Sequence, residues 1–195
     1  MNSSVRRPFF TLAIAGILGL TLPAPPGAGA TTGVTGQPTQ VVAKLTGPNS
    51  LNRTDLEWNV YGTDLGHMFL HGDELRFTFG DIFFNDMSYN VFYTMAWSSD
   101  RTLEDGLKFD DYVTDRPRHA RKLFDDETVS NVIPTYGISL GGRMFLHYMA
   151  VRRWGDPGYW DVAYSGLAYS DDRGQTWTMD PNVKWGDDSN FAQVA

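Results

Sequence analysis

Two aspartates, Asp64 and Asp81, have the residue type and the spacing of a paired-acid site. They lie on the two arms of a predicted β-hairpin whose two-residue loop is Gly72-Asp73. Counting outward from this loop places Asp64 opposite Asp81, and opposed residues in antiparallel strands have Cβ atoms about 4.5–5.5 Å apart. A register slip of a residue or two would still leave both acids at the same end of the hairpin.

Two carboxyl groups this close to each other could carry out acid–base chemistry. Each charge raises the pKa of its neighbour, so one group keeps its proton while the other is ionised. Glycoside hydrolysis uses such a pair, at about 5 Å for retention of configuration or about 6.5–9.5 Å for inversion, and both outcomes stay open. The alternative is that Asp64 caps one turn and Asp81 stabilises another. The convergence of the two acids favours a catalytic role.

The elements that position these acids are predicted to be β-strands. From Gln37 onward, short stretches rich in β-branched and aromatic residues alternate with Gly, Asp and Asn, without helical periodicity. A second hairpin surrounds Gly141-Gly142. The segment AWSSDR at 96–101 recurs as AYSDDR at 168–173, an internal repeat of about 70 residues. The fold class is therefore predicted to be all-β.

A repeat of two hairpins is the unit of a β-propeller blade, which has four strands and must stack on other blades. Propellers contain at least about four blades, whereas this sequence has room for two to three. We therefore expect an N-terminal fragment of a propeller. A complete small β-sandwich with two similar hairpins is the alternative.

The segment SDDRGQTW at 170–177 fits the Asp-box pattern of propeller hairpins. The aspartate of this pattern bonds backbone donors within its own turn, the glycine supplies a positive φ, and the tryptophan packs beneath the hairpin. We expect structural roles for the four residues that define the pattern, which are Ser170, Asp172, Gly174 and Trp177.

Six segments of the chain, taken together, resemble a known family. They are VYGTDLG at 60–66, FGDIF at 79–83, AWSSD at 96–100, IPTYGI at 133–138, GRMFLHYM at 142–149 and GLAYSDD at 166–172. In combination they are similar to a secreted actinobacterial domain of unknown function, the DUF4185 family, some of whose members are endo-D-arabinanases. The resemblance extends from about Lys44 to Ala195. It implies a five-bladed propeller that cleaves arabinan of the mycobacterial cell envelope, with Asp64 and Asp81 in its acidic motifs.

Further polar and aromatic residues are candidates for binding the substrate. His147 is predicted to face Tyr136 across the second hairpin, where it could line a cleft or be a satisfied half-buried histidine. Trp154, Tyr159 and Trp160 surround a glycine-rich turn and could either stack on sugar rings or pack within the fold. The predicted substrate-binding set is Asn90, Tyr136, His147, Trp154, Trp160, Asn190 and Gln193.

No cofactor is predicted. His67 and His71 are four residues apart, a spacing that suits zinc on a helix but not on the strand expected at this place. Calcium is an alternative, because the acidic loop at 186–190 offers hard oxygen ligands, although the same loop could simply be solvated.

Composition narrows the range of partners. A net charge of −7 disfavours binding to nucleic acid or to an anionic membrane surface, and leaves a neutral polysaccharide as the expected partner. The basic stretch at 116–122 is interpreted as a solvated loop. The chain contains no cysteine, so no disulfide framework supports it. The sequence does not predict the oligomeric state.

Three functions remain at this stage. A secreted glycoside hydrolase acting on an arabinofuranose polymer leads, and its rival is a non-catalytic propeller that binds carbohydrate or protein. A sialidase, which the Asp box would also suit, needs a cluster of arginines around a carboxylate. Arg76, Arg143, Arg152 and Arg153 are not spaced to indicate one.

The N-terminus has the three parts of an export signal. Arg6-Arg7 precede a mostly apolar stretch at 9–22, which prolines interrupt before it reaches the length of a membrane span, and Ala28-Gly29-Ala30 forms a small-residue cleavage site. Residues 1–30 are predicted to be a signal peptide, 31–43 a linker and 44–195 the propeller domain. The paired arginines leave the general-secretion and twin-arginine routes both open.

The exported protein should begin at Thr31, because Ala28 and Ala30 occupy the small positions before the cut. N-terminal sequencing of material recovered outside the cytoplasm checks this. A protein that starts at Met1 and stays in the cytoplasm would contradict export.

Overall fold

The structure is a computed structural model that describes residues 39–86, 89–90 and 93–187. The chain divides into two compact units, Met1–Thr39 and Gln40–Ala195, and the fold reported below is that of the second. The predicted signal peptide lies outside the described residues. In the part of the chain that is described, no helix has the length and hydrophobicity to span a bilayer.

The described chain is built mainly of β-strands, as its β-branched and aromatic stretches predict. The one α-helix in this part, α1, is a single turn at Thr54–Glu57, and a 3-10 turn follows at Leu103–Asp105. The strands are β1 (Val60–His71), β2 (Glu74–Phe84), β3 (Tyr89–Asn90), β4 (Thr94–Ser98), β5 (Asp111–Tyr112), β6 (Thr114–Arg116), β7 (His119–Ala120), β8 (Asn131–Leu140), β9 (Arg143–Trp154), β10 (Trp160–Ser170) and β11 (Thr178–Trp185).

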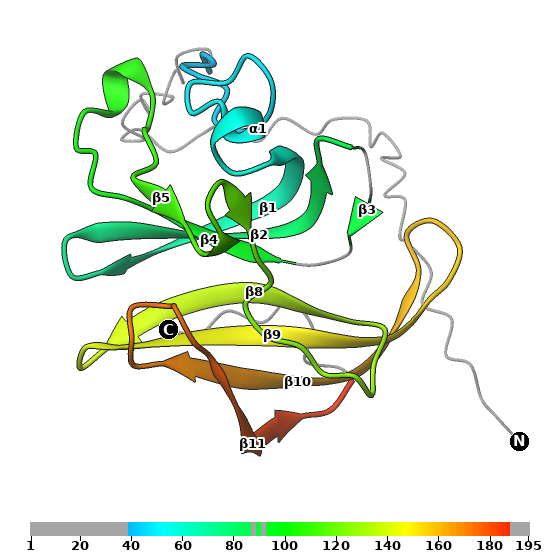
Figure 1. The fold of residues 1–195 in the computed structure, drawn as a ribbon. Coiled ribbons are helices and arrows are strands. Elements are labelled where there is room, and N and C mark those ends of the chain that lie inside the picture. Colours follow the sequence, from blue (N-terminus) through cyan, green and yellow to red (C-terminus); the bar gives the residue numbers. More distant parts are fainter. Residues whose placement is uncertain (1–38, 87–88, 91–92, 188–195) are drawn as a thin grey trace, which may run out of the picture. The chain divides into compact units, whose positions relative to one another are not determined.

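Two antiparallel sheets contain most of these strands (Figure 1). The first has the order β1-β2-β4-β5, with β3 paired to β2, and the second has the order β8-β9-β10-β11. A two-stranded ribbon, β6-β7, lies outside both sheets. In both sheets, the four strands of this order follow one another in the sequence from one edge of the sheet to the other. The two sequence repeats therefore correspond to two four-stranded meanders.

The main core lies between the two sheets. Phe69 and Met95 of the first sheet belong to the same buried cluster as Met144, Leu146 and Tyr148 of the second. Burial of such side chains contributes roughly 1.5–3 kcal/mol each. A second cluster covers the opposite face of the first sheet, beneath α1 and the neighbouring loops, and includes Phe77, Phe79, Phe109 and Tyr112.

Polar contacts join the sheets near the loop of the first hairpin. The His71 Nδ1 and Ser139 Oγ atoms are 2.8 Å apart. Glu74 pairs with Arg173, in the turn between β10 and β11, and with Arg76, whose side chain is only 1% exposed. Arg76 also lies 5.1 Å from the ring of Trp97. A buried guanidinium is costly unless it is paired, so Glu74 holds the two sheets at one relative position here.

The Asp box forms a closed turn between β10 and β11. The carboxylate of Asp172 accepts hydrogen bonds from the backbone N–H (2.8 Å) and the hydroxyl (2.6 Å) of Thr176. Ser170 Oγ accepts from the N–H of Gly174, which has a φ of 87°. The indole of Trp177 donates to the carbonyl of Gly174 and packs against the main core. These contacts support the predicted structural role of the four residues.

Replacing Asp172 with Ala should lower the free energy of unfolding by about 1–3 kcal/mol, because the donors of Thr176 lose their acceptor. Although burial alone would raise the pKa of Asp172, the hydrogen bonds from Thr176 and Ser170 hold it below the ordinary value. The carboxylate therefore stabilises the fold above the ordinary pKa, and this contribution is lost as the pH falls through the lowered pKa.

Urea unfolding followed by tryptophan fluorescence measures this difference. Asp171→Ala is the matched control, because Asp171 is the neighbouring acid and its side chain is 60% exposed in an ion pair with Arg143. An equal loss of stability in both variants would contradict the structural role of Asp172.

Candidate functional site

The first hairpin has the predicted register near its loop and a different one near the acids. His71 pairs with Glu74, as counting from Gly72-Asp73 predicts, and the ladder continues unbroken to His67. Beyond His67 it shifts, so that Asp64 pairs with Gly80. The predicted opposition of Asp64 and Asp81 is therefore wrong by one residue, although both acids do lie at the same end of the hairpin.

Two irregularities in the ladder cause this slip. On β1, Gly66 is an extra residue between two paired positions, and Leu65 and Gly66 have φ values of 61° and 100°. On β2, Asp81 follows the Asp64–Gly80 pair, has a φ of 40° and stands before the next shift of register. Such β-bulges bend a strand and re-aim its side chains. A non-glycine residue at positive φ is strained, and strain of this kind clusters at functional sites.

Gly80 allows the carboxylate of Asp64 to lie against β2. A Cβ atom at position 80 would be 2.9 Å from Asp64 Oδ1 and 2.8 Å from Leu65 Cδ1, closer than side chains can approach. Thr63 Oγ1 donates a 2.7 Å hydrogen bond to the carbonyl of Gly80 and fixes the two strands at this level. Any larger residue at position 80 would therefore displace the acid.

Both acids line one pocket of about 170 Å³. One wall comes from β1 and β2, and the other comes from the second sheet. The lining residues are Asp64, Leu65, Gly80, Asp81, Ile133, Met149, Trp154 and Trp160. The structure thus brings together four of the residues that the sequence proposes for catalysis or substrate binding, namely the two aspartates and the two tryptophans.

The surroundings of Asp64 in the acid pocket change its pKa. Burial, and after it the negative charge of Asp81, raise the pKa of Asp64 above its ordinary value. Both causes disfavour the charged form of the carboxyl group. A carboxyl group with a raised pKa retains its proton at a higher pH than usual, which is what a general acid requires.

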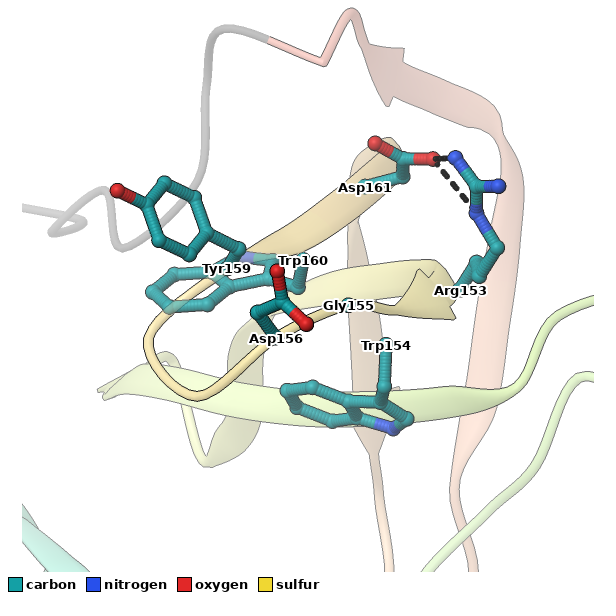
Figure 2. A pocket seen from close by; sticks show the side chains of 7 residues that line it. All are labelled: Arg153, Trp154, Gly155, Asp156, Tyr159, Trp160 and Asp161. Atoms are coloured by element: carbon teal, nitrogen blue, oxygen red, sulfur yellow. Dashed lines mark hydrogen bonds and ion pairs between the residues drawn. The ribbon is translucent and has the colours of Figure 1, made fainter.

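A second pocket, of about 450 Å³, lies at the turn between β9 and β10 (Figure 2). Trp154 and Trp160 form an opposed pair at the end of this hairpin, and their ring centroids are 6.4 Å apart. Both tryptophans also line the acid pocket. The lining residues of this turn pocket are Arg153, Trp154, Gly155, Asp156, Tyr159, Trp160 and Asp161.

Of the other predicted binding residues, Tyr136 and His147 are described and are not brought to these pockets. Tyr136 pairs with His147, as predicted, but neither lines the acid pocket or the turn pocket. His147 is 2% exposed, its Nδ1 lies 2.6 Å from Thr135 Oγ1, and burial lowers its pKa. Asn90 pairs with Ile82 through β3, and its side chain is outside the description. The last two candidates, Asn190 and Gln193, lie outside the described residues.

Sequence reasoning missed several residues that line the pockets. Ile133 and Met149 reach the acid pocket from the second sheet, and no local pattern indicates this contact. Gly80 makes room for Asp64 because it lacks a side chain, and no sequence pattern indicates this role. Arg153 and Asp161 flank the two tryptophans in the sequence, and this proximity is the signal that could have indicated them.

Metal ligands do not gather in the described part of the chain. No group of three or more His, Cys, Asp or Glu side chains there could hold an ion. His71 is in contact with Ser139. The loop at 186–190, the calcium candidate, lies mostly outside the described residues.

Comparisons with solved structures found distant similarities. A putative hydrolase from Bacteroides ovatus is 12% identical with a TM-score of 0.45, and the match covers 71% of this chain and 42% of that chain. A levansucrase variant from B. megaterium is 10% identical with a TM-score of 0.39, and the match covers 69% and 30%. The matched part is less than half the length of either protein. A search of curated proteins found no match.

A comparison with protein-family models found a match over most of the chain. The family described as "Domain of unknown function (DUF4185)" matches residues 49–195. The matched range includes both sheets and every residue that lines the acid pocket and the turn pocket. It confirms the resemblance carried by the six sequence segments. The chain therefore belongs to the DUF4185 family.

Proposed function

We propose that this domain is a glycoside hydrolase in which Asp64 and Asp81 form the acid pair. The observation that carries the proposal is that Asp64 and Asp81 line one pocket together with Trp154 and Trp160. Carbohydrate hydrolysis needs two carboxyl groups with different protonation states. Binding sites for organic ligands combine apolar walls with a few convergent polar groups, and this pocket has both.

Asp64 is assigned the role of general acid. Its raised pKa favours the protonated form, so it can donate its proton to the glycosidic oxygen as the bond between that oxygen and the anomeric carbon breaks. Asp81 takes the second role. It either attacks the anomeric carbon, forming a covalent intermediate that water then hydrolyses, or it accepts a proton from the water that attacks.

We further propose that the two meanders are blades of a β-propeller, five-bladed in the complete fold. The chain-order path of four antiparallel strands in each sheet supports this, because it is the topology of a blade. In this arrangement β1 and β8 are the inner strands. The acid pocket then lies beside the central axis, where strands of several blades could contribute to one site.

The proposed substrate is D-arabinan of the actinobacterial cell envelope, cleaved within the chain by the exported protein. A net charge of −7 supports a neutral polymer over an anionic one, since like charges repel. The export signal expected at 1–30 agrees with a substrate outside the cytoplasm. A non-catalytic carbohydrate-binding domain is the alternative, and it predicts no cleavage by the intact protein.

Asp64→Asn and Asp81→Asn should each reduce cleavage of D-arabinan by about 10²–10⁴-fold or more, because an amide can neither donate an acidic proton nor act as base or nucleophile. Release of reducing ends from D-arabinan measures this. Asp73→Asn is the matched control, since Asp73 lies in the loop at the opposite end of the hairpin and its side chain is 99% exposed. Normal cleavage by both variants would contradict the assignment.

Stability measurements separate lost chemistry from lost structure. A pKa raised in the folded state means that Asp64 favours folding below its ordinary pKa and that this contribution is lost as the pH rises through the raised pKa. The neutral amide of Asp64→Asn should therefore leave the free energy of unfolding unchanged at acid pH and increase it at neutral pH. A variant that unfolds at neutral pH would indicate a structural acid instead.

A further inference from the structure

We propose that the turn pocket between β9 and β10 is a second saccharide subsite, which holds a neutral, hydroxyl-rich sugar next to the acid pocket. The inference rests on the proposed function for its choice of ligand. It goes beyond that function by adding Tyr159, Asp156 and the Arg153–Asp161 pair to the binding surface, and by setting a minimum length for the glycan.

Two backbone hydrogen bonds close the turn without any ligand. The N–H of Tyr159 donates to the carbonyl of Asp156 at 2.8 Å, and the N–H of Gly155 donates to the carbonyl of Tyr159 at 3.0 Å. Pro157 and Gly158, whose φ is 86°, occupy the two central positions of a type II β-turn, the positions that favour these residues. A preorganised turn presents its side chains at a low entropic cost on binding.

Aromatic rings at this turn are open to solvent. Tyr159 is 72% exposed and Trp154 is 43% exposed, on either side of the same turn (Figure 2). Core packing does not explain rings with this exposure. Tyrosine and tryptophan offer large, stiff, amphipathic contact areas. These surfaces can stack on the apolar C–H faces of sugar rings.

The polar groups of the turn pocket complement hydroxyl groups. Arg153 Nε and Nη2 both donate to Asp161 Oδ2, the first at 3.0 Å. Arg153 Nη1, Asp161 Oδ1 and the carboxylate of Asp156 form no hydrogen bond to other described residues, so the pocket offers both donors and acceptors. An ion pair this exposed, with side chains 76% and 46% accessible, adds little to stability. The arrangement fits sugar hydroxyls, which donate and accept at the same atom.

Charge defines the kind of sugar. Asp156 and Asp161 give the turn pocket two carboxylates, against the single guanidinium of Arg153. Like-charge repulsion disfavours a sulfated sugar or a uronic acid, while a neutral sugar pays no such penalty. The turn pocket therefore selects a neutral saccharide.

The two pockets share part of their walls. Trp154 and Trp160 line both of them. A glycan bound at the acid pair therefore extends past the tryptophan pair onto the turn. The ligand must be long enough to occupy both pockets, so affinity should increase with the length of the oligosaccharide until both are filled.

Calorimetric titration of the Asp64→Asn protein with arabinan oligosaccharides of increasing length tests the subsite without cleavage. Adding Tyr159→Ala should weaken binding of the longer oligosaccharides by about tenfold, a loss typical of an aromatic anchor, and should flatten the dependence on length. Tyr159→Phe should retain the affinity because it retains the ring. Tyr61→Ala is the matched control, because Tyr61 is 43% exposed and lines neither pocket.

The outcomes separate this inference from the proposed function. Loss of affinity in Tyr159→Ala with retention in Tyr159→Phe and Tyr61→Ala supports the subsite, even if the Asp64→Asn protein still cleaves arabinan and the catalytic assignment fails. Equal affinity in Tyr159→Ala and its parent overturns the subsite, even if Asp64→Asn is inactive. Failure of the parent to bind any arabinan oligosaccharide also overturns it.

Discussion

The burial of Asp64 beside a second acid, Asp81, is the constraint on which the site depends. Like charges in a partly desolvated pocket separate unless the backbone prevents it. Here three backbone features prevent it: the bulge at Leu65-Gly66, the positive φ of Asp81, and the absence of a side chain at Gly80. Between this end and the hairpin loop the ladder is regular and pairs five residues of β1 without a break.

The first sheet cannot form the site alone. Ile133, Met149 and the two tryptophans of the pocket belong to the second sheet, so the pocket exists only while the sheets are packed together. The shared core, which includes Phe69, Met95 and Leu146, holds the sheets together. The polar contacts of Glu74 with Arg173 and of His71 with Ser139 fix it near the opposite end of the hairpin. A change that loosens either contact should therefore affect the pocket from a distance.

Much of this arrangement could be predicted from the sequence, and the failures have physical causes. Registers next to Gly72-Asp73 and Gly141-Gly142 were correct, because a two-residue loop fixes the pairing beside it. The predicted partner of Asp64 was wrong by one residue. Leu65 adopts a positive φ, which is rare for leucine and could not be predicted from its residue type. His147 was paired correctly but lies in a buried environment outside the pockets. Contacts between the sheets, such as that of Met149, depend on packing that no local pattern encodes.

The most direct test of the coupled acid pair is the titration of Asp64 followed by carboxyl carbon chemical shifts in the wild-type protein and in Asp81→Asn. We expect a pKa for Asp64 above the ordinary 3.8 in the wild type. In Asp81→Asn this pKa should fall but remain above 3.8, because the charge is removed while the larger cause, burial, persists. A wild-type pKa at or below 3.8, or a raised pKa that does not respond to the loss of Asp81, would contradict a coupled acid pair in this pocket.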